Sequence, residues 1–173
     1  HRLATRRQLS STGYTNGMSK DAAFKIRVAQ PDDAAVVTDF NIGCAAESED
    51  MTLDPPRVRA GVEAVLADAK RGRYYLAEDA GGAIGQIMIT LEWSDWRNAW
   101  IWWIQSVYVH RDARRRGVFS ALLQHIEKEA GHEGAALLRL YVDTENDAAE
   151  RTYLANGFKR AHYRMLDKLP PSN

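Results

Sequence analysis

The chain has 173 residues, of which 45% are hydrophobic, enough for one domain with a substantial core. Lys plus Arg equals Asp plus Glu at 23 each, a balance that argues against a dedicated nucleic-acid binder, which usually carries a basic surplus. The single cysteine excludes an intrachain disulfide, and the histidines lack the paired spacing of zinc ligands, so we expect a reducing compartment and no metal.

Residues 1–17 are basic and show no hydrophobic periodicity, so we predict that they lie outside the core. Three origins stay open: the remnant of an expression tag ahead of a native start at Met18, the end of an organellar transit peptide, or a disordered tail. The sequence therefore predicts one domain over residues 18–173, with no internal repeat and no proline-rich linker to divide it.

The first half of the domain reads as strand, two helices and three strands. Alternating apolar residues predict a strand at 24–30, and Pro31 with two acids opens a helix that runs to Glu47. Pro55 and Pro56 precede a second helical run at 57–69. Three predicted strands follow, of which the third is apolar on both faces and therefore central; they span 72–79, 83–93 and 99–109.

After Gly117 the apolar period changes from two to 3.6, which predicts an amphipathic helix at 118–130. A strand at 136–143 follows, then a helix between an N-cap at Asn146 and a stop at Gly157. A closing strand is predicted at 158–166, which completes the order β, α, α, β, β, β, α, β, α, β.

An arginine-rich segment, RDARRRGVFSALL, joins the central strand to this helix. Gly117 stands at the helix start, where unpaired backbone N–H groups and the helix dipole favour an anion, and its missing Cβ would let a phosphate approach closely. The flanking arginines can add charge-assisted hydrogen bonds. The alternative interpretation is a solvated arginine cluster that caps a helix.

The stretch QSVYVHRDARRRGVFSALL, followed by LRLYVDTENDAAERTYLANGF, resembles the GNAT N-acetyltransferase superfamily across Phe24–Leu166. The family's acetyl-CoA loop, Q/R-x-x-G-x-G/A, aligns with Arg114, Gly117 and Phe119, and the phenylalanine departs from the pattern. A second signature, N-x-x-A-x-x-x-Y-x-x-x-G-F, begins at Asn146. The resemblance implies a single-domain α/β (α+β) fold, with a mixed, mostly antiparallel sheet of about six strands, a splayed pair of strands, and about four flanking helices.

The resemblance also implies that acetyl-CoA is the donor, that no metal takes part, and that the acceptor is a primary amine that attacks the thioester directly in a ternary complex. The central strand would pair with the pantetheine arm, and the loop would hold the pyrophosphate. The residues expected to bind the cofactor are Val107, Tyr108, Val109, Arg114, Arg115, Arg116, Gly117, Val118, Phe119, Ser120, Asn146 and Tyr153.

Acetyl transfer also needs a base, because an alkylamine with a pKa of roughly 10.4 is mostly protonated at neutral pH. Glu92 is the first choice, with Glu47 and Glu49 as alternatives that would face the acceptor; each could instead be a surface charge. The resemblance gives Tyr153 the task of stabilising or protonating the leaving thiolate, and the Val107 amide would stabilise the oxyanion.

All five tryptophans lie between Trp93 and Trp103. We expect Trp102 and Trp103 to pack in the core. Trp93 and Trp96 stand among loop-forming polar residues, where they could line a pocket for a cationic amine, make an oligomer contact or simply pack.

Two other functions would use some of the same residues. A nucleic-acid binder would use the arginines and tryptophans, but the zero net charge argues against it; a non-catalytic acyl-CoA-binding regulatory module is the alternative, and Tyr153 favours the enzyme. We expect a small-molecule or protein amine as acceptor, no nucleic-acid or membrane partner, and a homodimer as the assembly to test. The expected location is cytoplasmic, with an organellar one left open by the basic tail.

Overall fold

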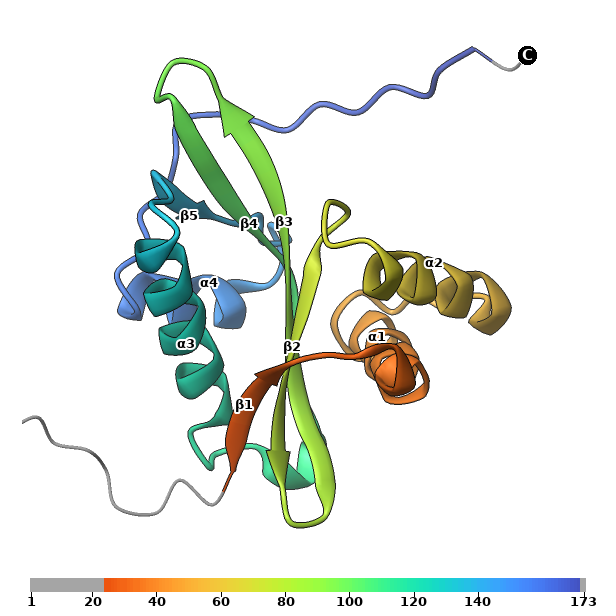
Figure 1. The fold of residues 1–173 in the computed structure, drawn as a ribbon. Coiled ribbons are helices and arrows are strands. Elements are labelled where there is room, and N and C mark those ends of the chain that lie inside the picture. Colours follow the sequence, from red (N-terminus) through yellow and green to blue (C-terminus); the bar gives the residue numbers. More distant parts are fainter. Residues whose placement is uncertain (1–23, 172–173) are drawn as a thin grey trace, which may run out of the picture.

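The computed structural model describes residues 24–171, in which one sheet lies between two layers of helices (Figure 1). The predicted tail at 1–17 lies outside the described residues. In chain order the elements are β1 (Lys25–Val28), η1 (Pro31–Asp33), α1 (Ala34–Ser48), α2 (Pro55–Ala67), β2 (Arg73–Asp79), β3 (Gly82–Ser94), β4 (Ala99–Val109), η2 (Arg111–Ala113), α3 (Val118–His132), β5 (Leu137–Arg139) and α4 (Asp147–Ala155).

The strands lie in the order β1-β2-β3-β4-β5. The first four pair antiparallel, whereas β4 and β5 run parallel over only three residue pairs, from Ile101 with Leu137 to Trp103 with Arg139. The predicted class, a mixed and mostly antiparallel sheet with flanking helices, is confirmed.

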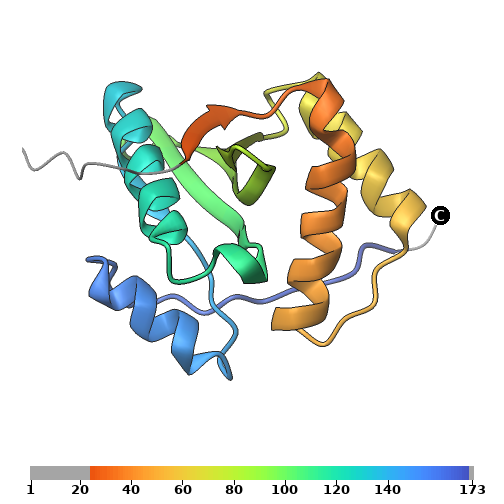
Figure 2. The same cartoon turned by 90° about the horizontal axis from the view of Figure 1, so that it is seen from below.

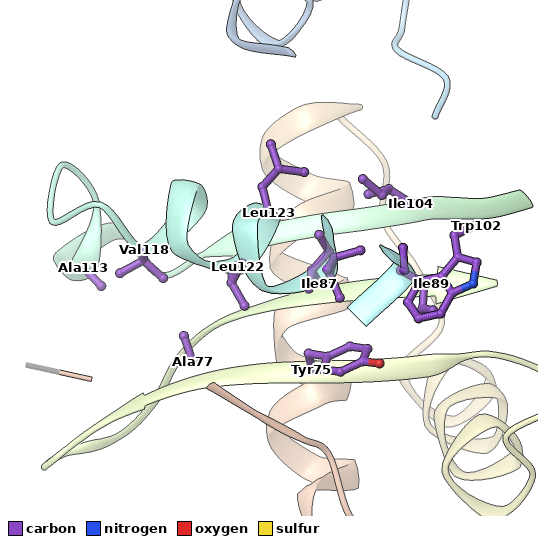
Figure 3. Close-up of a cluster of buried hydrophobic side chains, with 12 residues drawn as sticks. Tyr75, Ala77, Ile87, Ile89, Trp102, Ile104, Ala113, Val118, Leu122 and Leu123 are labelled. Carbon is purple, nitrogen blue, oxygen red and sulfur yellow. The ribbon is translucent and has the colours of Figure 1, made fainter. Parts of the chain in front are cut away.

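Helices cover both faces of the sheet: α1 and α2 lie on one side, and α3 and α4 on the other (Figures 1 and 2). The larger core cluster joins α3 to the sheet and includes Trp102, Ile87 and Leu122, all fully buried (Figure 3). A second cluster, around Val37 and Leu76, joins α1 and α2 to the opposite face. Both faces of β2 and β3 are therefore buried near their middle, whereas β4, the strand predicted to be buried on both faces, buries Trp102 and Ile104 on one face and leaves Trp103 and Gln105 on the other only partly buried.

An irregularity in β4 opens the sheet on one side. Met88 of β3 pairs with Ser106, but the next residue, Ile89, pairs with Ile104, so Gln105 is an extra residue in β4, which is the arrangement of a β-bulge. The pairing of β4 with β5 has already ended at Trp103. From Ile104 onward, β4 has no β5 partner, which is the splayed pair expected from the sequence.

The sequence and the structure differ at two strands. The predicted strand 136–143 is shortened to Leu137–Arg139, because the chain leaves β4 after this point. The predicted strand 158–166 does not form: Phe158 packs against the main core, but residues 159–166 are exposed and pair with no strand within the described residues. Alternating apolar residues stabilise a strand only when they bury one face, so the sheet described here has five strands rather than about six.

Gly72, just before β2, gives a test of the fold. Its φ is +147°, and an added Cβ would lie 2.6 Å from the Ile89 carbonyl oxygen. We therefore expect Gly72→Ala to destabilise the domain by at least about 1–3 kcal/mol, measured by urea unfolding with tryptophan fluorescence. Gly61→Ala is the matched control: it meets no atom within 4 Å inside α2, so it should stabilise by about 0.5–1 kcal/mol. Equal effects of the two variants would contradict this account.

Candidate functional site

A cleft of about 420 Å³ opens where β4 ends, between the last turn of α1, the start of α3 and the inner face of α4. It lies beside the end of β4, beyond the residues that pair with β5. Its lining consists of Glu47, Ser48, Val107, Tyr108, Val109, Arg114, Phe119, Ala149, Thr152 and Tyr153.

The β4 wall of the cleft presents free backbone groups. The N–H of His110 donates to the Ile84 carbonyl of β3 at 2.9 Å, so the alternation of an antiparallel pair turns the N–H and C=O groups of Val109 and Val107 away from β3. In agreement, the Val109 carbonyl accepts a hydrogen bond from Arg114 Nε at 3.0 Å on that open side. An extended ligand can therefore pair with this edge as an added strand would.

The second wall is the N-terminus of α3. Gly117 is its N-cap, with φ at +79° in the left-handed region, and an added Cβ would meet no atom within 4 Å. The first N–H groups of this 15-residue helix, those of Val118, Phe119 and Ser120, have no acceptor within the helix. Open space in front of such amides fits the phosphates of a nucleotide-derived cofactor.

The arginines of the loop are not equivalent. Arg116 pairs with Asp79 at 2.9 Å, and Arg115 adopts a left-handed φ of +63°. Arg114 spans the cleft mouth, with its guanidinium on the Glu47 carboxylate. Arg114 and Arg116 therefore pair with carboxylates from different parts of the chain, which the sequence could not indicate.

Among the residues that line the cleft, Glu47 is the one that carries a carboxylate. It accepts a hydrogen bond from the Tyr108 hydroxyl at 2.9 Å as well as from Arg114. The Arg114 contact first, and then the Tyr108 hydroxyl, lower the pKa of Glu47, so the group is ionised at neutral pH. Gly43 of α1 permits this arrangement, since an added Cβ there would lie 3.0 Å from the Tyr108 hydroxyl oxygen.

Tyr153 reaches the same cleft from α4. Its ring packs edge-on against Phe119 and Phe158, with centroid distances of 5.6 and 5.5 Å. Burial, and to a smaller extent the neighbouring Cys44, raises the pKa of Tyr153 to about 12, so its hydroxyl keeps its proton at neutral pH. The departure from the family pattern at Phe119 thus has a structural consequence: the ring lines the cleft and supports the tyrosine.

The other residues singled out by the sequence lie elsewhere. Asn146 caps α4, its side chain accepting from the Ala149 N–H at 3.0 Å, as predicted for an N-cap. Glu49 is exposed at the end of α1 and does not line the cleft. Trp93 and Trp96 lie at the tip of the β3–β4 hairpin, where Trp96 is 93% exposed. Trp93 pairs with Trp100, seven residues before Val107, or roughly 20 Å along the strand.

Glu92 and Trp103 belong to a cluster along β4 that the sequence did not reveal. The Trp103 indole N–H donates to Glu92, and Arg139 lies over the indole ring. Trp102 is fully buried, as expected, whereas Trp103 is only partly buried. Arg139 and Tyr141 lie in the predicted strand 136–143, whose pattern did not single them out; the charged Arg139 among apolar residues was the available signal.

Within residues 24–171, no three His, Cys, Asp or Glu side chains are grouped as metal ligands would be. None of the helices in the same range is both long enough and apolar enough to cross a membrane.

The sequence model of the acetyltransferase (GNAT) family matches residues 44–158, which is more than half of the chain. The chain belongs to the GNAT acetyltransferase family. The match includes the strand, the arginine loop and the helix that together form the cleft. The GNAT resemblance seen in the sequence is therefore confirmed.

Known GNAT-like proteins agree with this assignment. An aminoalkylphosphonate N-acetyltransferase of Salmonella typhimurium is 32% identical over 117 residues, which cover 68% of this chain and 75% of that protein. The crystal structure of a possible acetyltransferase from Clostridium difficile 630 has a TM-score of 0.82 and 37% identity, covering 86% of this chain and 99% of the other. An aminoglycoside N-acetyltransferase in complex with CoA shares the fold at 15% identity, with a TM-score of 0.71 and coverage of 84% and 94%.

The α3 N-terminus gives the second prediction. Gly117→Asp places bulk and negative charge where the phosphates of acetyl-CoA are expected, so calorimetry should show a loss of acetyl-CoA affinity in a folded protein. Gly134→Asp is the matched control, because Gly134 also has a left-handed φ, +69°, and no atom within 4 Å of an added Cβ. If both variants bind acetyl-CoA like the wild type, the phosphates do not lie at Gly117.

Proposed function

We propose that this GNAT protein is an acetyl-CoA-dependent N-acetyltransferase in which a primary amine attacks the thioester directly, in a ternary complex. The observation that carries the proposal is the convergence of three elements on one cleft: the outward edge of β4 at Val107, the first turn of α3, whose Phe119 lines the cleft two residues after the N-cap Gly117, and Tyr153 of α4. These groups fit the pantetheine arm, the pyrophosphate and the leaving sulfur in turn.

Binding of the donor would use backbone groups for the most part. The α3 amides and the loop arginines would hold the pyrophosphate, and the Val107 and Val109 edge would pair with the amides of the pantetheine arm. The Val107 N–H then faces the thioester carbonyl, where it would stabilise the charge that develops on oxygen. Asn146 caps α4, so it would contribute to donor binding indirectly, by fixing where α4 lies.

The acceptor must lose a proton before it attacks. We assign this proton to Glu47, which lines the cleft and is ionised, and which would receive it directly or through a water molecule. Glu92 lies opposite Ile101, six residues before Val107, or roughly 20 Å along the strand, so it would act on a more distant part of the acceptor.

The transfer itself forms one bond and breaks one. The amine nitrogen attacks the thioester carbon, the C–N bond forms, and the C–S bond breaks with its electron pair on sulfur. The pKa of Tyr153 is about 12, above that of a thiol, so its hydroxyl would keep its proton and stabilise the thiolate by donating a hydrogen bond. The thiolate would take its final proton from solvent.

The first experiment is release of CoA thiol from acetyl-CoA against a panel of amines. The panel includes an aminoalkylphosphonate, because the 32% identical relative is named for that acceptor, together with alkylamines, amino acids and lysine peptides. Binding of acetyl-CoA without turnover of any acceptor would favour the alternative, a non-catalytic acyl-CoA-binding module.

Tyr153→Phe separates binding from chemistry. The ring and its packing stay while the hydroxyl is lost, so acetyl-CoA affinity should hardly change, whereas kcat should fall by roughly 10²- to 10³-fold, the cost of removing one hydrogen-bond donor to charge that develops in the transition state. Tyr163→Phe is the control, since Tyr163 is exposed outside the cleft. A fall in kcat of less than about threefold, far below that range, would leave Tyr153 as a packing residue only.

A further inference from the structure

The face of the sheet that carries α1 and α2 continues past the cleft toward the β3–β4 hairpin. Met88 packs in the α1–α2 core, and side chains alternate along a strand, so Thr90 and Glu92 of β3 lie on this same face. The Tyr108 ring packs against Phe40 of α1, which places the end of β4 there too. The β3–β4 hairpin extends beyond α1 and α2 (Figure 1), and on this part of the face Glu92 and Tyr141 are exposed.

Six residues form a continuous polar and aromatic wall on this face. Gln105, the bulged residue, donates to Thr90 Oγ1 at 2.6 Å and accepts from the Tyr141 hydroxyl at 3.3 Å. The Tyr141 and Trp103 rings have centroids 6.4 Å apart. This acceptor wall consists of Thr90, Glu92, Trp103, Gln105, Arg139 and Tyr141; since Gln105 precedes Val107 by two residues, the wall begins at the cleft.

Arg139 is the member with unused binding capacity. Its guanidinium carbon lies 5.2 Å from the centre of the Trp103 ring, and its Nη1 lies 3.5 Å from a Glu92 oxygen. Among residues 24–171 it makes no hydrogen bond, although its side chain is only 29% exposed. A guanidinium that lies over an indole ring and makes no hydrogen bond in this part of the chain can still offer two parallel hydrogen bonds to an oxyanion.

Glu92 explains why the arginine is held in this way. Its carboxylate accepts from the Trp103 indole and lies at one edge of the guanidinium, which leaves the opposite N–H groups for another partner. Glu92 is therefore a positioning residue for Arg139. The pair together carries no net charge, so the surrounding surface does not repel an incoming anion.

We propose that Arg139 binds an anionic group of the acceptor, so that the acceptors of this enzyme are primary amines that also carry a carboxylate or a phosphonate. This inference rests on the proposed function, because it places the amine at Val107. Arg139 lies opposite Trp103, four residues before Val107, so the amine and the anion are separated by on the order of 10 Å. An acceptor with several bonds between the two groups fits this spacing better than a short amino acid.

The test compares acceptors that differ only in the anion. Acetylation of ω-aminocarboxylates of increasing chain length is measured beside ω-aminoalkylphosphonates and uncharged alkylamines of equal length. We expect kcat/KM of the wild type to favour the anionic acceptors, and to favour 8-aminooctanoate over β-alanine. Comparing the carboxylate and phosphonate series shows which oxyanion the site prefers.

Arg139→Gln should lower kcat/KM for the anionic acceptors by about tenfold to a hundredfold, mainly through KM, with little change for the alkylamines. Arg139→Lys keeps the charge but not the two-pronged geometry and should recover part of the loss. Arg59→Gln is the control, since Arg59 pairs with Glu63 on α2, outside the cleft and the wall. Melting temperature and acetyl-CoA affinity confirm that each variant is folded.

The possible failures differ in what they show. Equal use of anionic and uncharged amines, or an equal loss for both in Arg139→Gln, would overturn the role of Arg139 while the acetyltransferase activity stands. If no amine is acetylated, the proposed function fails. Calorimetric titration of 8-aminooctanoate into the CoA-bound protein then decides the inference alone: tighter binding to the wild type than to Arg139→Gln supports it, and equal binding overturns it.

Discussion

The separation of β4 from β5 is the constraint on which the cleft depends. A strand inside a sheet uses its N–H and C=O groups on both sides, and a ligand cannot pair with it. Here the two strands pair only as far as Trp103, and the bulge at Gln105 alters the direction of β4 just beyond. Val107 and Val109 therefore have no strand partner on this side within the described residues, although side chains contact their carbonyls: Cys44 Sγ at 3.9 Å from that of Val107 and Arg114 Nε at 3.0 Å from that of Val109.

The helices around this opening are arranged so that separate elements reach the same point. The fully buried Trp102 and Leu122 fix α3 against the sheet, so the N-terminus of α3 lies at the end of β4. Phe119, on the first turn of that helix, packs on Tyr153 and holds α4 across the cleft. One aromatic contact thus links the end of α3 that is proposed to bind the pyrophosphate to the tyrosine proposed to lie near the sulfur.

The electrostatics of the site are local rather than global, as the zero net charge requires. Arg114 and Arg116 are each paired with a carboxylate from a distant part of the chain, Glu47 and Asp79. Such pairs at a surface contribute little to stability, but they fix where the side chains lie. The second guanidinium site, Arg139 on Trp103, is built from an ion pair with Glu92 and an aromatic face in the same way.

Several features could be predicted from the sequence because they depend on neighbours along the chain. Periodicity, proline and glycine placed α1, α3, α4 and the hairpin, and the N-cap at Asn146 was confirmed as a side-chain to backbone bond within one turn. The prediction of a strand at 158–166 was wrong. Alternating residues show that a segment can form a strand, but they do not show that a partner strand is present.

The sequence by itself determined the class of fold, the family and the local motifs at Gly117 and Tyr153. Only the tertiary structure decided which carboxylate shares the cleft: Glu47 lies there, while Glu92 lies along β4 beside Arg139. The physical reason is that these positions depend on strand register, on one bulge and on helix packing. Each of these is set by contacts between residues far apart in the sequence, where no local pattern records them.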